Sequence, residues 1–109
     1  MSTLSTHVLD TAAGRPAGGI RVTLARGAEL LGSAVTDADG RVKAFRSEGG
    51  ALRPGSYRLT FDVGEYLRQT GGDSFYQEIV IQFEISADLE HYHVPLLLSR
   101  FGYTTYRGS

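Results

Sequence analysis

The sequence predicts an all-β fold, a sandwich of two antiparallel sheets packed face to face. In most segments apolar residues recur at every second position, which is the period of strands with one buried face. The 14 glycines and 3 prolines of the 109-residue chain divide it into short segments of this kind. Short strands separated by frequent turns are typical of β-sandwiches.

Eight strands are expected along the chain. The alternation is clearest in residues 20–24, 57–63 and 75–85, where large apolar residues face one way and mostly polar residues face the other. One face of each of these strands is therefore expected to be buried. The remaining strands are expected at residues 4–9, 30–36, 41–45, 90–99 and 103–107.

The connections carry residues that favour tight turns. Gly-Gly at 18–19, Asp-Gly at 39–40 and Pro-Gly at 54–55 supply the positive or fixed φ angles that such turns require. Residues 64–70 are the one expected helix, about two turns long, and a pair of glycines would end it. Because no repeat, low-complexity tract or linker interrupts the pattern, a single domain is expected over residues 1–109.

The composition excludes several classes of function. Eleven Lys and Arg against 12 Asp and Glu leave a net charge of -1, so bulk charge would not recruit nucleic acid or an anionic membrane. The absence of cysteine excludes disulfides, thiolate catalysis and cysteine-built metal sites. We find neither a secretory signal pattern nor a stretch approaching the roughly 20 apolar residues that span a bilayer. A soluble, cytoplasmic protein is expected.

Two of the expected strands are partly apolar on both faces. Residues 75–85 carry Tyr76 and Val80 on the second face, and residues 90–99 contain the run Val-Pro-Leu-Leu-Leu. Coverage by another subunit and a locally crowded core are both compatible with this pattern. Pro95 cannot donate a ladder hydrogen bond, so it suggests an edge or a bulge.

The three histidines are the side chains best suited to exchange protons at neutral pH. His91 and His93 are one residue apart in an expected strand, so they project from the same face. They form a candidate acid-base or metal pair, but two partly exposed histidines at the rim of a sheet would show the same spacing. If His7 lay close to both, three imidazoles could bind zinc with an open fourth position, although this spacing is a weak metal signal.

Arg41 and the C-terminal residues hold the other candidate groups. Arg41 follows the Asp-Gly turn, where its guanidinium could bind a planar, oxygen-rich ligand through two hydrogen bonds or could simply be solvated. Tyrosines and threonines alternate as in a strand at 103–106, followed by Arg107 and the carboxylate of Ser109. These groups would be held in place if the strand docks, and would only aid solubility if it frays.

Four segments taken together resemble one family. They are Leu-Ser-Thr-His-Val-Leu-Asp at 4–10 with Gly-Arg-Pro-Ala at 14–17, Asp-Gly-Arg at 39–41, His-Tyr-His-Val-Pro-Leu-Leu-Leu-Ser at 91–99 and Tyr-Arg-Gly-Ser at 106–109. In this order and spacing they resemble the 5-hydroxyisourate hydrolases, the transthyretin-related enzymes of urate breakdown. The histidine run and the closing tetrapeptide are the specific motifs. The chain departs at Arg100-Phe101, where many relatives carry Pro-Tyr.

The resemblance implies a transthyretin-like sandwich of eight strands and one short helix, assembled as a homotetramer whose central channel holds the active sites between subunits. It also implies metal-independent hydrolysis of the cyclic amide of 5-hydroxyisourate, without a cofactor, to 2-oxo-4-hydroxy-4-carboxy-5-ureidoimidazoline. By motif position, the implied catalytic residues are His7, Arg41 and His93. The implied substrate-binding residues are His91, in a supporting role, and Tyr106, Arg107, Gly108 and Ser109.

Two other functions stay open at this point. Transthyretin itself has this fold and carries an aromatic hormone without hydrolysing it, so a carrier of an aromatic small molecule is one alternative. A zinc hydrolase built on the three histidines is the other.

Overall fold

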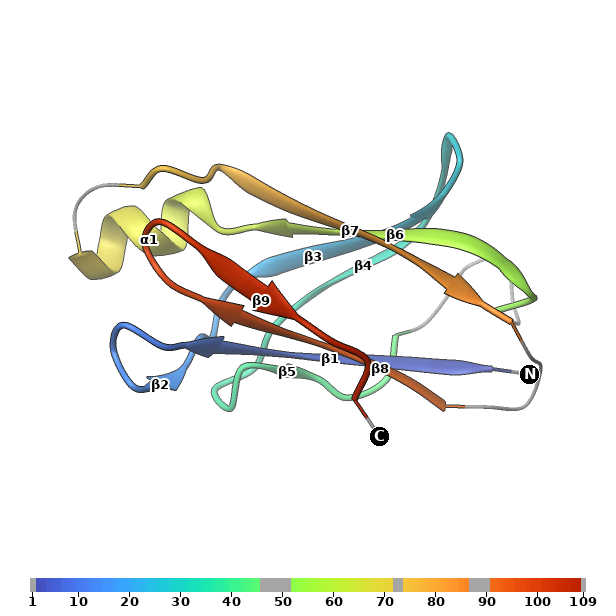
Figure 1. Ribbon diagram of the computed structural model, residues 1–109, viewed down its shortest axis with the longest axis horizontal. Coiled ribbons are helices and arrows are strands. Elements are labelled where there is room, and N and C mark those ends of the chain that lie inside the picture. The colour runs from blue at the N-terminus through green and yellow to red at the C-terminus, as the bar shows by residue number, and fades with distance from the viewer. Residues whose placement is uncertain (1, 46–51, 72–73, 87–90, 109) are drawn as a thin grey trace.

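Two β-sheets lie face to face, with one short helix at an end of the sandwich (Figure 1). The computed structural model describes residues 2–45, 52–71, 74–86 and 91–108. The strands are β1 (Thr3–Asp10), β2 (Arg15–Pro16), β3 (Arg21–Arg26), β4 (Glu29–Val35), β5 (Arg41–Val42), β6 (Gly55–Asp62), β7 (Glu78–Ile85), β8 (His91–Leu98) and β9 (Tyr103–Thr105), and the helix is α1 (Gly64–Gly71). The sandwich predicted from alternation is confirmed.

The strands divide unevenly between the two sheets. The first sheet has the order β2-β1-β8-β9, with β5 also paired to β1, and the second has the order β4-β3-β6-β7. Each of the eight predicted strands has a counterpart here, and the helix lies where it was expected. Strand β2 is an addition, a two-residue pairing of Arg15 and Pro16 with the end of β1. Strand β7 begins three residues later than predicted, and Phe75 is 68% exposed.

One pairing differs from the expected antiparallel arrangement. Strands β1 and β8 run parallel, in a register that extends from Thr3 opposite His91 to Asp10 opposite Leu98. Antiparallel pairing is imposed on neighbours that a tight turn joins, whereas parallel strands need a long crossover. The chain between β1 and β8 passes through the whole second sheet, so no turn constrains their relative direction (Figure 1).

Pro95 does not mark a sheet edge, because β8 is an interior strand between β1 and β9. The Pro95 carbonyl accepts a hydrogen bond from Thr105 Oγ1 at 2.7 Å, so this residue turns its polar backbone atoms toward β9. The ladder with β9 covers residues 96–98 and is interrupted at Pro95, which has no N–H to donate, before a single bridge between His93 and Gly108 resumes the pairing. The proline therefore shortens one ladder inside the sheet.

The inward faces of both sheets form one hydrophobic core. Leu4, Thr6 and Val8 point inward from β1 and are fully buried, and the Thr6 hydroxyl donates to the Val94 carbonyl at 2.6 Å. The largest wholly buried side chains are Tyr57, Phe61, Leu4, Ile20, Leu24, Leu59, Ile79, Ile85, Leu96 and Leu98. This alternation forces the intervening side chains of β1 onto the outer face.

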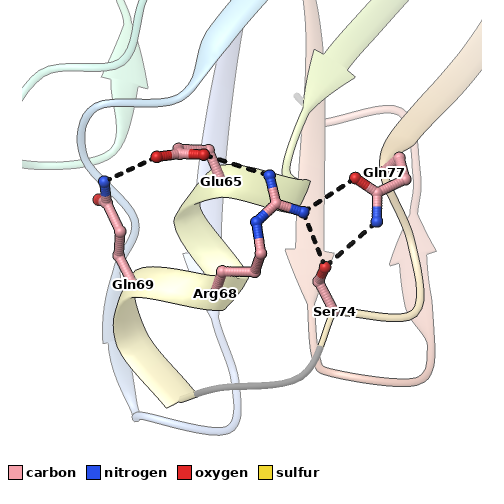
Figure 2. Close-up of polar contacts among 5 residues, drawn as sticks. All are labelled: Glu65, Arg68, Gln69, Ser74 and Gln77. Atoms are coloured by element: carbon pink, nitrogen blue, oxygen red, sulfur yellow. Dashed lines mark hydrogen bonds and ion pairs between the residues drawn. The ribbon is translucent and has the colours of Figure 1, made fainter.

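Polar contacts fix helix α1 against the segment that leads into β7 (Figure 2). The Arg68 guanidinium donates to Ser74 Oγ at 3.2 Å and to Gln77 Oε1 at 3.0 Å, and it also pairs with Glu65 at 3.2 Å. Gln69 completes the group by donating to Glu65 at 3.1 Å. These exposed side chains brace the helix end of the sandwich. Within the described residues, no helix has the length and apolar character that crossing a membrane requires.

Candidate active site

The outer face of the first sheet collects the predicted acid-base residues. Ser5 and His7 alternate with the buried residues of β1, so both side chains point away from the core. The parallel register places Ser5 beside His93, and the antiparallel register with β5 places His7 beside Arg41. His91 follows the same alternation, so the structure brings His7, Arg41, His91 and His93 to one face.

Ser5 joins the two histidines of β8. Its Oγ lies 2.7 Å from His93 Nδ1 and 2.8 Å from His91 Nε2, both within hydrogen-bonding distance. The other ring nitrogen of His91, Nδ1, lies 2.6 Å from Thr3 Oγ1. The alternation of β1 is enough to put Ser5 on the face of His7, but only the register with β8 shows that it lies between two imidazoles.

His7 is oriented by the turn that precedes Arg41. Its Nε2 donates to the Asp39 carbonyl at 2.9 Å, and because a carbonyl only accepts, this nitrogen carries the hydrogen. Nδ1 of the neutral ring is then the acceptor. Asp37 Oδ1 accepts from the N–H groups of Arg41 and Asp39, chiefly the former, and this holds the pKa of Asp37 below its ordinary value. The turn therefore holds the His7 ring, through the Asp39 carbonyl, and the backbone of Arg41, through the Asp37 carboxylate.

Gly40 lets this turn approach β1. It has a φ of +74°, and its carbonyl accepts from the Val8 N–H at 2.7 Å. A Cβ at this position would lie 2.3 Å from the Val8 carbonyl oxygen, which no side chain can do. The Asp-Gly-Arg segment is thus explained physically, because glycine allows the close approach that places Arg41 beside His7.

The environment of His93 favours its neutral form. Partial burial, and then electrostatic repulsion by Arg41, His7 and His91, hold the pKa of His93 below its ordinary value of 6.5. A neutral imidazole at pH 7 can accept a proton, which is the requirement for a general base. With Nδ1 engaged by Ser5, Nε2 is the nitrogen available for this role.

The C-terminal segment is docked against β8, which decides between the two alternatives left open by the sequence. Beyond β9, the Gly108 N–H donates to the His93 carbonyl at 2.8 Å. A Cβ on Gly108 would lie 2.6 Å from Cδ2 of the His93 ring, so the segment packs directly against this imidazole. Ser109, which the sequence assigned to the same tail, lies outside the described residues.

His93 lies between two recesses of the surface. One, of about 250 Å³, contains Ser5, Arg41 and His91 with it. The other, of about 330 Å³, lies between β7 and the C-terminal segment and is lined by Tyr106 and Arg107 among others. The Arg107 guanidinium lies over the Tyr92 ring at 4.7 Å from its centroid. The structure thus places Arg107 in the second recess and Arg41 in the first.

The positions of the histidines test the zinc hydrolase that the sequence left open. In the described ranges, no three His, Cys, Asp or Glu side chains are arranged so that they could hold a metal ion. His91 instead directs both ring nitrogens to hydroxyl groups, Ser5 and Thr3. The arrangement does not favour a tri-histidine zinc centre.

Comparison with known proteins identifies the family. The model of the HIUase/Transthyretin family matches residues 4–108 of this chain. The chain belongs to this family. It is 48% identical over 110 residues to a 5-hydroxyisourate hydrolase of Salmonella dublin, covering 97% of this chain and 80% of that protein.

Solved structures of the HIUase/Transthyretin family share the fold. The 5-hydroxyisourate hydrolase of Klebsiella pneumoniae has a TM-score of 0.89 and 41% identity, with 100% of both chains covered. Sea bream transthyretin in complex with thyroxine has a TM-score of 0.88 and 30% identity, covering 96% of this chain and 93% of that one. These likenesses confirm the family and the sandwich that the four segments predicted.

Proposed function

We propose that this chain hydrolyses 5-hydroxyisourate, opening its six-membered ring to 2-oxo-4-hydroxy-4-carboxy-5-ureidoimidazoline. The observation that carries this proposal is the convergence of His7, Arg41 and His93 on one face of the first sheet. It occurs in a chain 48% identical to one protein named for this activity and 41% identical to another.

The proposed reaction begins with a water molecule held between His7 and His93. Nε2 of neutral His93 takes a proton from this water as its oxygen bonds to the ring carbonyl carbon. The Arg41 guanidinium, a fork with several donors, orients the substrate oxygens and stabilises the negative charge of the tetrahedral intermediate. The carbon–nitrogen bond then breaks, and the proton on His93 passes to the departing ring nitrogen.

The other predicted contacts belong to the same proposal. We assign substrate binding to His91, Tyr106, Arg107, Gly108 and Ser109, as the motif positions suggest. Gly108 is supported by its packing against His93, and Tyr106 and Arg107 by the recess that they share with His93.

Activity that survives a chelator would support the metal-independent reaction, and loss of activity that zinc restores would contradict it.

We further propose a homotetramer with active sites between subunits. Strands β7 and β9 are the outer strands of their sheets in this chain, and the second recess lies between them. Exposed strand edges beside apolar side chains favour association with another chain, and Val80 and Tyr103 are 48% and 43% exposed here. Light scattering of the purified protein tests this proposal, because a monomer mass would contradict it.

A cytoplasmic location likewise stays a prediction, to be tested by cell fractionation.

A carrier of an aromatic small molecule is the second candidate. It is favoured by the likeness to sea bream transthyretin in complex with thyroxine. The identity to that protein is 30%, against 48% for the Salmonella dublin hydrolase. Because two imidazoles and a guanidinium on one face suit proton transfer better than passive binding, we favour the hydrolase. Tight binding of an aromatic ligand without turnover would favour the carrier.

The deciding experiment generates 5-hydroxyisourate from urate with a urate-oxidising enzyme and follows the decay of its absorbance. We expect a decay that accelerates in proportion to the concentration of this protein. The matched control is the same protein carrying Ser33→Ala, a change on the exposed face of β4. A decay equal to the spontaneous one at every protein concentration would overturn the proposed function.

A further inference from the structure

A continuous chain of hydrogen-bonding groups leads away from His93. It runs from His93 Nδ1 to Ser5 Oγ at 2.7 Å, and from Ser5 Oγ to His91 Nε2 at 2.8 Å. It ends with His91 Nδ1, 2.6 Å from Thr3 Oγ1. Ser5 is 7% exposed, whereas His91 and Thr3 are both exposed. The chain therefore connects a sheltered imidazole to one that water can solvate.

The number of hydrogens on Ser5 makes the two imidazoles dependent on each other. A serine hydroxyl carries one hydrogen, so Ser5 can donate to only one of the two neutral rings and must accept from the other. When Ser5 donates to His91 Nε2, His93 Nδ1 carries a hydrogen and His93 Nε2 is free to act as a base. When Ser5 donates to His93, the hydrogen of that ring lies on Nε2 and the base is lost.

We propose that Ser5 and His91 form a proton relay that sets the basic tautomer of His93 and shares the positive charge that the reaction creates there. This inference rests on the proposed function. When His93 Nε2 takes the proton of water, Nδ1 passes its hydrogen to Ser5 Oγ, and Ser5 passes its own hydrogen to His91 Nε2. His93 is then neutral and His91 is imidazolium. Reversal of the same steps returns the proton to His93 for the departing nitrogen.

The surroundings of the two rings favour this transfer. His93 lies near Arg41 and His7, and Lys43 lines the same recess. On its other side, the recess against β7 is lined by Arg107 and Glu84 among others. Partial burial and then like charges destabilise imidazolium at His93, and they hold its pKa below the ordinary value. Exposure to water stabilises the same charge at His91. In this scheme Ser5 and His91 act through His93 and are positioning residues, and for His91 this role replaces the supporting substrate contact that its motif position suggests.

The first test reads the tautomer without any reaction. In nitrogen NMR spectra of the full-length protein at neutral pH, we expect the His93 hydrogen on Nδ1 in the wild type and in Ser33→Ala. In Ser5→Ala we expect it on Nε2, because the acceptor for Nδ1 is gone. A wild-type His93 with its hydrogen on Nε2 would overturn the relay, whatever substrate the protein takes.

The second test uses the hydrolysis of 5-hydroxyisourate in mixtures of light and heavy water. We expect Ser5→Ala to lower kcat by about tenfold to a hundredfold with little change in KM, as part of the contribution of a general base. His91→Gln should have an equal effect, and the double variant should be no worse than either. The dependence of kcat on deuterium content should be curved in the wild type and linear in Ser5→Ala, since several protons move in the former.

The outcomes separate the relay from the proposed function. A wild-type protein that does not consume the substrate refutes the proposed function. An active wild type with unchanged Ser5→Ala, with additive losses in the double variant, or with a linear deuterium dependence refutes the relay alone. A rise in KM without a fall in kcat for His91→Gln would make His91 a substrate ligand and would also refute the relay. If Ser5→Ala does not fold, His91→Gln alone decides by the same deuterium dependence.

Discussion

The outer faces of the two sheets both carry polar side chains, but they differ in how these side chains are held. On the second sheet, Arg21 donates to Ser33 at 3.2 Å and Gln82 donates to Ser56 at 3.0 Å, all through exposed contacts. On the first sheet, Ser5 and His93 are sheltered and hydrogen-bonded to each other. The same pleated surface therefore carries solvated side chains in one case and coupled, titratable ones in the other.

The difference arises from what lies beside the first sheet. The turn that contains Gly40 approaches β1 from one side, and the segment that contains Gly108 packs onto His93 from the other. Together they reduce the access of water to His93 and bring Arg41 close to it. Partial burial and neighbouring charge, rather than polar character, therefore distinguish the candidate active face of the first sheet from the outer face of the second.

The largest expected effect comes from removing the proposed base. His93→Gln keeps a polar side chain of similar size but has no group that takes a proton at neutral pH. We expect kcat for 5-hydroxyisourate to fall by about a hundredfold to ten-thousandfold, the usual contribution of a general base. Stopped-flow absorbance measures it, and a loss below about threefold would remove His93 from the mechanism.

A matched pair of arginine changes compares the two faces directly. Arg41→Lys keeps the charge but loses the planar fork, so we expect kcat to fall by about tenfold to a hundredfold. Arg21→Lys, on the outer face of the second sheet, makes the same chemical change and should leave kcat unaltered. If the two variants had the same kcat in the same assay, the outer face of the first sheet would have no special part in the reaction.

Two glycine changes test the packing of the C-terminal segment. Gly108→Ala places a Cβ 2.6 Å from the His93 ring, so the ring or the segment must shift. Because small misplacements of catalytic groups slow reactions strongly, we expect kcat to fall on the order of tenfold. The control is Gly102→Ala, whose Cβ meets Ser99 Oγ at an ordinary 3.7 Å. Equal activity of both variants would show that contact with His93 is not needed.

The smallest expected effect is a shift of the pH profile. A base works in its neutral form, so activity should be lost as the pH falls through the pKa of His93. Because burial and then Arg41, His7 and His91 hold that pKa below 6.5, the acid limb of kcat/KM should have its midpoint below 6.5. An NMR titration of the ring in Arg41→Gln should show a higher pKa than in the wild type. An unchanged pKa there would remove Arg41 as a cause.

Local pattern predicted the strands and their faces, and the four motif segments predicted the family. The alternation of β1 was sufficient to place Ser5 and His7 on one face. It could not show that β8 is the neighbour of β1, that the two run parallel, or that Pro95 lies in an interior strand. Pairing between distant strands depends on the packing of the whole sandwich, so the role inferred for Ser5 was outside the reach of the sequence.

The parallel pairing of β1 with β8 has a consequence for the order of events during synthesis. Thr3 and His91 are neighbours in space but 88 residues apart in the chain. The ribosome therefore synthesises His7 long before β8, the strand that completes the surroundings of its ring. Contacts of such long range also form slowly in refolding. We expect a nascent chain that ends before β8 to be inert, with activity arising only as the final segment is delivered.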